Sequence, residues 1–162
     1  ASNHDATMLK DALAVSAAKG LPRYQVVQPE YNLYARSSFE GPLQDLCIAE
    51  KLGVVVYYSL ASGFLTGKYR TAEDLAQSAA RGGKIGGYLN ERGLRILAAL
   101  DAVSAAHGTT PAAVALAWLL AQPGVTAPIA SATRVSQVKT FAAAADLRLT
   151  DAEVAALTDA GR

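Results

Sequence analysis

The 162-residue sequence has a single cysteine, no strong excess of either charge and no long apolar run. Cys47 cannot form a disulfide within the chain, and its apolar helical surroundings indicate an inert core residue. The net charge is +1 and no basic run is present, so we expect neither nucleic acid nor an anionic membrane as a partner. No apolar stretch approaches the roughly 18 residues of a membrane-spanning helix.

The beginning of the chain also lacks familiar features. It has no initial methionine, and no cationic start is followed by an apolar segment. The second absence argues against a secretory signal and favours a cytoplasmic location. A helical pattern begins a few residues after Ala1, leaving no room for a complete strand before it. We therefore expect a fragment whose preceding part is missing.

The chain is rich in apolar residues, at 51%, and only 18% of its residues are charged. This composition is typical of a globular chain, and the length suffices for one domain with a real core. We therefore expect one domain over residues 1–162. Apolar periodicity and capping residues predict helices at 5–19, 42–52, 90–106, 111–122, 135–144 and from 150 onward, with strands at 24–28, 54–56 and 125–129.

Strands that alternate with helices indicate parallel βαβ units and hence an α/β fold. A doubly wound sheet and a (β/α)₈ barrel are both compatible with this order. No Gly-x-Gly-x-x-Gly follows any expected strand, which argues against a Rossmann nucleotide site.

The most informative stretch is 53–70, which begins with the β-branched run Val54–Val56. This run predicts a strand buried on both faces. Two tyrosines, a glycine-bearing turn and Lys68 follow. An aromatic ring can stack on a flat heterocycle, small residues let backbone N–H groups approach a phosphate, and lysine supplies positive charge. An ordinary strand and loop is the alternative interpretation.

Small and polar residues follow each expected strand, at 28–32, 57–68 and 131–134. The carboxyl ends of parallel strands share one edge, where α/β proteins bind ligands, so we expect a site there. A glycine-rich segment further along carries Arg81 and Lys84, which could close over a ligand or simply form a solvated loop.

Five motifs, in this order along the chain, resemble the aldo-keto reductase family. They are Ser2-Asn3, V-Q-P-E-Y-N-L at 27–33, Y-Y-S-L-A-S-G-F-L-T-G-K-Y-R at 57–70, P-A-A-V-A-L-A-W-L at 111–119 and A-P-I-A-S-A-T at 127–133. The resemblance implies the C-terminal half of a (β/α)₈ TIM barrel, from the end of strand five through strands six to eight. It also implies an oxidoreductase that reduces a small carbonyl substrate with NADP(H) or, less often in the family, NAD(H).

The resemblance assigns cofactor-binding roles residue by residue. The nicotinamide carboxamide would be held by Ser2, Asn3 and Gln28, with Tyr57 stacked on the ring. The pyrophosphate would lie along Tyr58, Ser59, Leu60, Ala61, Ser62 and Gly63, with Lys68 as its cation. The adenosine end would meet Ser131, Thr133 and Gln137, with Arg134 as a weaker candidate for a 2′-phosphate. Thr140 and Phe141 stand where the family often has an acidic residue and asparagine, so the adenine contacts should differ.

The family's catalytic tetrad of Asp, Tyr, Lys and His lies on the first half of the barrel, which this chain would lack. No residue here offers a substitute. His4 suits a capping or surface role, and His107 lies at a helix end, where the dipole favours a cation. Neither Tyr31 nor Tyr34 has a neighbouring lysine in sequence that would lower its pKa. We expect no catalytic residue and no metal ligand in the chain.

Three functions follow, in order of preference. The first is the cofactor-binding half of an NADP-dependent reductase, inactive alone and partnered by the N-terminal half of the barrel. The second is a non-catalytic binding or regulatory subunit that holds NADPH. The third is an autonomous half-barrel, whose open sheet edges would favour dimers or aggregates.

Overall fold

The computed structural model describes residues 1–74 and 85–162. Arg81 and Lys84, considered above as closing residues, lie outside the described residues. The elements alternate between helices and short strands, as expected for an α/β chain. In order they are α1 (Ala6–Lys19), β1 (Val26–Val27), α2 (Pro42–Ala49), β2 (Gly53–Val56), η1 (Ala61–Thr66), α4 (Glu91–Ala106), α5 (Pro111–Leu120), β3 (Ala127–Pro128), α6 (Val135–Asp146) and α7 (Asp151–Ala160).

The three strands form a parallel sheet in the order β1-β2-β3. Val27 pairs with Val54, and Val55 pairs with Ala127. The regular strands are shorter than expected, although pairing continues beyond β3, where Ile129 N–H donates to Val56 O at 2.8 Å. Proline at Pro29 and Pro128 supplies no N–H to a ladder, which shortens the regular pairing. The predicted parallel α/β arrangement is confirmed.

The sheet is not covered on both faces, so the expectation of a doubly buried β2 is wrong. Val54 and Val56 are fully buried, whereas Gly53 and Val55 between them are partly exposed. On β1, Val26 is 44% exposed. Side chains alternate between the faces of a strand, so within the described residues helices cover one face and leave the other open. We call this second face the open face.

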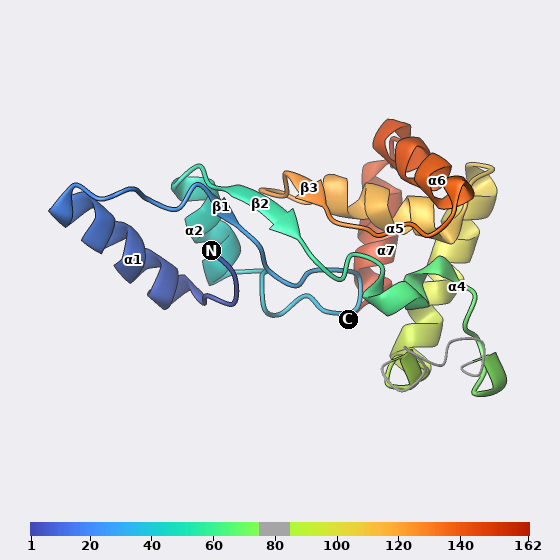
Figure 1. The fold of residues 1–162 in the computed structure, drawn as a ribbon. Helices are drawn as coiled ribbons and strands as arrows, with labels where there is room; N and C mark the ends of the chain where they lie inside the picture. The colour runs from blue at the N-terminus through green and yellow to red at the C-terminus, as the bar shows by residue number, and fades with distance from the viewer. Residues whose placement is uncertain (75–84) are drawn as a thin grey trace.

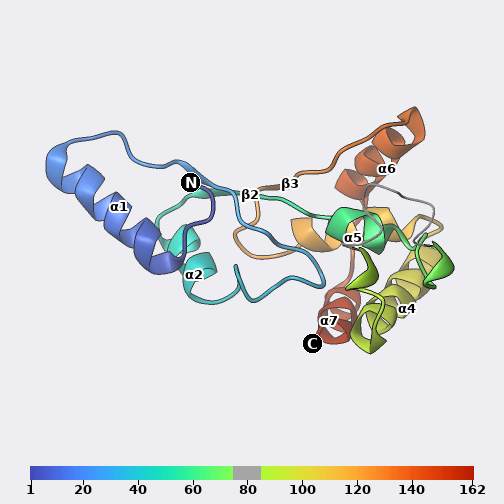
Figure 2. The same ribbon diagram turned by 60° about the horizontal axis from the view of Figure 1, so that its bottom comes forward.

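The helices gather unevenly around the sheet. Helices α4, α5, α6 and α7 cluster at one end, and α1 lies at the other, in both views (Figures 1 and 2). Every residue of α5 from Ala113 to Leu119 is buried, so this helix forms the centre of the core. No single helix in residues 1–74 and 85–162 is long and apolar enough to cross a membrane; α4 and α5 meet that requirement only when taken together across a 96° bend.

Several predicted helix ends are confirmed. Asp5 caps α1 by accepting from Met8 N, and Thr150 and Glu153 form the predicted capping box of α7. Helix α2 is shorter than expected, because it ends at Ala49 and Lys51 then adopts a left-handed φ of 53°. Gly53 therefore starts β2 and does not close the helix.

A polar network anchors α7 beneath the end of β1. The buried Tyr31 hydroxyl donates to Glu40 Oε1 at 2.7 Å, and Arg36 pairs with the same carboxylate through Nε and Nη2 at 2.7 and 2.9 Å. Arg36 Nη1 also donates to Thr158 O at 2.6 Å, and Trp118 Nε1 donates to Thr158 Oγ1 at 3.0 Å. Burial raises the pKa of Tyr31 above its ordinary value. Burial opposes ionisation of Glu40, but hydrogen bonds from Arg36 and Tyr31 outweigh it and lower the pKa of Glu40.

Replacing Glu40→Gln should destabilise the chain by about 2 kcal/mol at neutral pH, because a largely buried guanidinium loses its charged partner. A lowered carboxyl pKa stabilises the folded state above the unfolded value of 4.5 and ceases to do so as pH falls through the folded value. The difference between wild type and variant should therefore shrink below about pH 4.5 in urea denaturation.

Glu91→Gln is the matched control, because the Glu91 side chain is 93% exposed in its pair with Arg95. It should change stability by less than about 0.5 kcal/mol. Equal effects of the two substitutions would contradict a stabilising role for the Glu40 network.

Candidate functional site

The register brings three of the predicted residues to the carboxyl edge of the sheet. Ser2 forms a parallel bridge with Gln28, and Ser2 Oγ donates to Gln28 O at 3.2 Å. Glu30 forms the next bridge with Tyr57. Paired residues, and residues two apart on a strand, share a face. The pairing therefore places Ser2, Gln28 and Tyr57 on the open face, with Gln28 exposed and Tyr57 half-buried.

The backbone after β2 is strained where the phosphate loop was predicted. Five described non-glycine residues have positive φ, and four of them are predicted site residues. One of the four, Asn3 with φ of 56°, precedes α1 and is of a type that visits this region readily. The other three, Tyr58, Ala61 and Ser62, with φ of 53°, 47° and 58°, lie in the loop after β2. The left-handed region costs such residues about 1–2 kcal/mol each. Backbone strain of this kind clusters at functional sites, where the surrounding structure enforces it. The strain therefore supports a functional role for this loop.

Asn32 holds the strained loop in place. Its side chain is fully buried, and Nδ2 donates to Tyr58 O at 3.0 Å. Its Oδ1 accepts from Tyr34 N at 2.9 Å and from Ala35 N at 2.8 Å. In the sequence, Asn32 is notable only as part of the motif at 27–33. An asparagine just past a strand often bonds nearby backbone, which would have indicated the local turn but not the long-range bond to Tyr58.

A cavity of about 670 Å³ opens beside the loop, between η1, the start of α5 and α6. Its volume lies within the usual range for small-molecule sites. Seven predicted residues line it: Tyr58, Leu60, Ser62, Gly63, Lys68, Ser131 and Gln137. The remaining lining residues were not predicted as site residues: Thr66, Thr110, Ala112, Ala130, Thr140 and Phe141.

The lining of this cavity favours an anionic, partly flat ligand. Lys68 is the charged side chain among the described lining residues, and its Nζ lies 4.7 Å from the centroid of the Tyr69 ring. Six lining residues carry a hydroxyl: Tyr58, Ser62, Thr66, Thr110, Ser131 and Thr140. Two of these hydroxyls, those of Thr66 and Thr140, already donate to the backbone, to Gly63 O and Ser136 O. Hydroxyls and one cation, with no carboxylate among the described lining residues, suit phosphate oxygens.

Other predicted residues lie at the margin of the cavity or in the core. The Tyr57 ring is 5.2 Å from the Tyr58 ring, which places it next to the cavity lining. Ser59 is buried and its hydroxyl donates to Val56 O at 3.0 Å, and Ala61 is also buried. The amides of Ala61 and Gly63 donate within the loop, to Tyr58 O and Leu60 O. These two amides are therefore not available to a phosphate, contrary to the expectation for this loop.

The start of α6 carries the remaining predicted residues. Gln137 Oε1 accepts from Thr133 N at 2.7 Å and from Arg134 N at 3.1 Å. Gln137 thus caps its own helix while also lining the cavity. Thr133 and Arg134 are exposed beside it.

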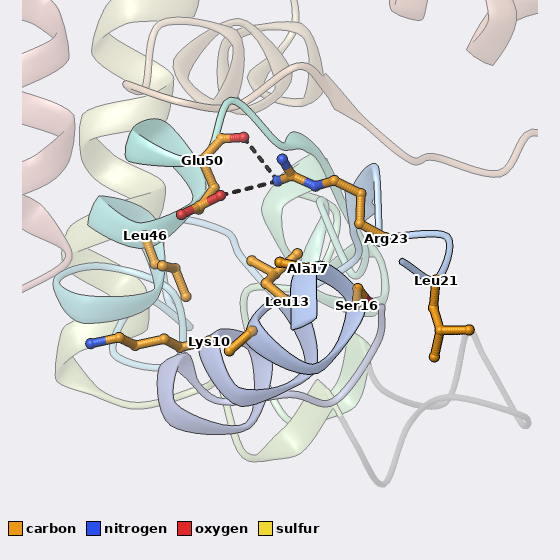
Figure 3. A pocket seen from close by; sticks show the side chains of 9 residues that line it. Lys10, Leu13, Ser16, Ala17, Leu21, Arg23, Leu46 and Glu50 are labelled. Carbon is orange, nitrogen blue, oxygen red and sulfur yellow. Dashed lines mark hydrogen bonds and ion pairs between the residues drawn. The ribbon is translucent and has the colours of Figure 1, made fainter. Parts of the chain in front are cut away.

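A second cavity, of about 390 Å³, lies between α1 and α2. Its walls are mostly apolar, and Arg23 there is bound to Glu50 through both the carboxylate and the backbone oxygen, at 3.2 and 3.1 Å (Figure 3). None of the predicted site residues lines it. The smaller cavity therefore does not contain the predicted site.

The two histidines hold structural positions. His4 Nδ1 lies 2.9 Å from Ser2 O, and its ring packs edge-on against Tyr24. His107 caps α4 and its Nε2 lies 2.8 Å from Glu153 Oε1 of α7. Within residues 1–74 and 85–162, no group of three or more His, Cys, Asp or Glu side chains is arranged to hold a metal ion.

Comparison with known proteins agrees with the motif resemblance. The sequence model of the Aldo/keto reductase family matches residues 1–162. The chain is 33% identical to "Probable voltage-gated potassium channel subunit beta" of Arabidopsis thaliana, covering 75% of this chain and 38% of that protein. It is 30% identical to "Aldo-keto reductase yakc [NADP(+)]" of Schizosaccharomyces pombe, over 83% of this chain and 41% of that protein. It is 39% identical to "Uncharacterized oxidoreductase Mb2320" of Mycobacterium bovis, over 67% of this chain and 33% of that protein. The chain thus spans less than half the length of these relatives.

Removing the Asn32 side chain should release the loop after β2. Asn32→Ala deletes the three hydrogen bonds of a buried side chain and should lower stability by about 2–3 kcal/mol. It should also reduce hydrogen-exchange protection of Leu65 N–H, which bonds Leu60 O, by more than the global destabilisation accounts for.

Asp5→Ala is the matched control, since Asp5 also caps a helix, α1, and this helix lies at the other end of the molecule from the loop (Figure 1). Its loss should cost about 1 kcal/mol and leave the local protection of Leu65 unchanged. If both variants lost protection of Leu65 N–H only in proportion to their loss of global stability, Asn32 would not stabilise this loop locally.

Proposed function

Since this chain belongs to the aldo/keto reductase family, we propose that it is the cofactor-binding part of an oxidoreductase that reduces aldehydes or ketones to alcohols with NADP(H). The observation that carries the proposal is the cavity at the strained loop, where Lys68 and several hydroxyls converge beside the open face. Use of NAD(H) in place of NADP(H) is compatible with the same residues.

The proposed cofactor position follows the order of the elements. Gln28 would hold the nicotinamide carboxamide at the open face, because its side-chain amide can both donate to and accept from that group. The Tyr57 ring stacks on the nicotinamide, and Lys68 and Ser62 meet the phosphates. The adenosine end extends toward Ser131 and α6, with Arg134 available to a 2′-phosphate.

The chain's own residues would bind and orient the cofactor, which supplies the hydride when bound. Stacking on Tyr57 decides which face of the nicotinamide meets the carbonyl carbon. The proton for the product alcohol needs a different source. Tyr31 does not suit this role, because it is buried, donates to Glu40, and burial raises its pKa above the ordinary value. We therefore propose that the proton donor lies outside these 162 residues.

The open face also supports the proposal that part of the active site comes from outside these residues. Parallel sheets are normally covered on both faces. Here Val26 is exposed and Val55 is partly exposed on the same face. The chain also spans only 38% and 41% of two relatives from the comparison, although it aligns over most of its own length. We propose that residues 1–162 form one domain unit, the C-terminal half of a (β/α)₈ barrel, and that an N-terminal half covers the open face.

A second candidate function is a subunit that holds NADPH and acts through a partner rather than by turnover. It is favoured by the relatives from Arabidopsis thaliana and Oryza sativa, both named "Probable voltage-gated potassium channel subunit beta", at 33% and 31% identity. An aldehyde-dependent loss of NADPH by a protein that carries both halves of the barrel would favour the reductase. Cofactor binding without such loss would favour the subunit.

Tyr57→Ala should weaken NADPH binding about fivefold, the equivalent of about 1 kcal/mol for a lost aromatic stack. The measurement is a titration of NADPH fluorescence with the chain. Tyr24→Ala is the matched control, because Tyr24 is an exposed tyrosine that packs on His4 away from the cavity. An affinity unchanged by Tyr57→Ala would remove this ring from the nicotinamide position.

Lys68→Met should weaken NADPH binding by at least tenfold and reduce the salt dependence of the affinity, since it removes the charged side chain among the described lining residues. Lys10→Met, in the smaller cavity between α1 and α2, should leave both quantities unchanged. Equal effects of the two substitutions would indicate that the charge acts only through the net charge of the chain.

A further inference from the structure

The α6 wall of the large cavity has few groups able to distinguish one flat ring from another. Three residues form this wall: Gln137, Thr140 and Phe141. They lie at the adenosine end of the proposed cofactor position, so what they offer to a ligand decides how the purine base is recognised.

Gln137 can offer a base only donors. Its Oε1 already accepts from the amides of Thr133 and Arg134 and from the Thr133 hydroxyl, at 2.7, 3.1 and 3.3 Å. Turning the amide around would break this cap. The Nε2 group can therefore donate to a ring nitrogen, but the side chain cannot accept a hydrogen bond from an amino group on the base.

Thr140 does not discriminate either. Its Oγ1 donates to Ser136 O at 3.2 Å within α6, which leaves lone pairs that can accept. A hydroxyl can also rotate to donate. It can thus serve an amino group or a carbonyl at the same position on a ring.

Phe141 supplies the apolar surface of this wall. It is half-buried, packed against the core and part of the cavity lining. Stacking on an aromatic side chain tolerates any base, because every base has a π-face. The described lining contains no carboxylate that could act as a fixed acceptor.

We propose, resting on the proposed function, that this chain selects the purine end of its dinucleotide by stacking on Phe141 and not by hydrogen-bond readout. Adenine presents an amino donor at C6 and an acceptor at N1, whereas hypoxanthine presents a carbonyl acceptor and an N1–H donor. The two bases share the acceptor N7, to which Gln137 Nε2 would donate, and the ring face, on which Phe141 would stack. The site therefore accepts dinucleotides of either base.

The test compares NADPH with its hypoxanthine analogue in fluorescence titrations of the 162-residue chain. The dissociation constants should differ by less than about fivefold, whereas a site built to bond the amino group rejects the analogue far more strongly. Phe141→Ala should weaken both ligands by about five- to a hundredfold and leave their ratio unchanged. Phe141→Leu keeps most of the volume, removes the π-face and should weaken both ligands in the same direction.

Val138→Ala is the matched control, because Val138 lies on α6, is exposed and does not line the cavity. It should change neither affinity. NADPH binding with an analogue affinity more than fivefold weaker would overturn the stacking inference and leave the proposed function standing. So would binding insensitive to both Phe141 variants. Binding of neither ligand at millimolar concentration would overturn both proposals.

Discussion

The parallel register between β1 and β2 is the constraint on which the candidate site depends. Glu30 pairs with Tyr57, and Ser2 pairs with Gln28 one strand away. Because side chains alternate, a slip of one residue would move Tyr57 to the face that the helices bury. The register is strongly specified, since the same slip would expose Val54 and Val56, which are fully buried. The core thus fixes the position of the open-face residues without touching them.

Two polar clusters fix the segment after β1 to other parts of the chain. Asn32 ties the end of β1 to the strained Tyr58 carbonyl, and Glu40 with Arg36 ties the same segment to Thr158 of α7. Strained backbone persists only where its surroundings over-determine it. The loop after β2 can therefore keep an unfavourable conformation, because the segments that contact it are anchored in the core.

Local features of this fold could be predicted from the sequence, and long-range ones could not. The capping box at Thr150 and Glu153 follows from residue types at a fixed spacing, so α7 was predicted correctly. The run Val54–Val56 indicated a strand but not that one face would stay open, because coverage depends on which helices pack there. Motif resemblance assigned Lys68 and Gln137 to one cofactor site and marked Phe141 as a departure at the adenine contacts. That Phe141 forms part of the cavity wall is known only from the packing in the structure.

The open face has a consequence for how such a polypeptide behaves during synthesis. Its valines and outer strand edges are surfaces that other chains can pair with. Yield in a cell would then depend less on how well the helices form than on how soon a complementary surface arrives. A covering segment translated earlier on the same ribosome would meet each strand as it emerges, whereas separate production would leave concentration to decide between correct pairing and self-association.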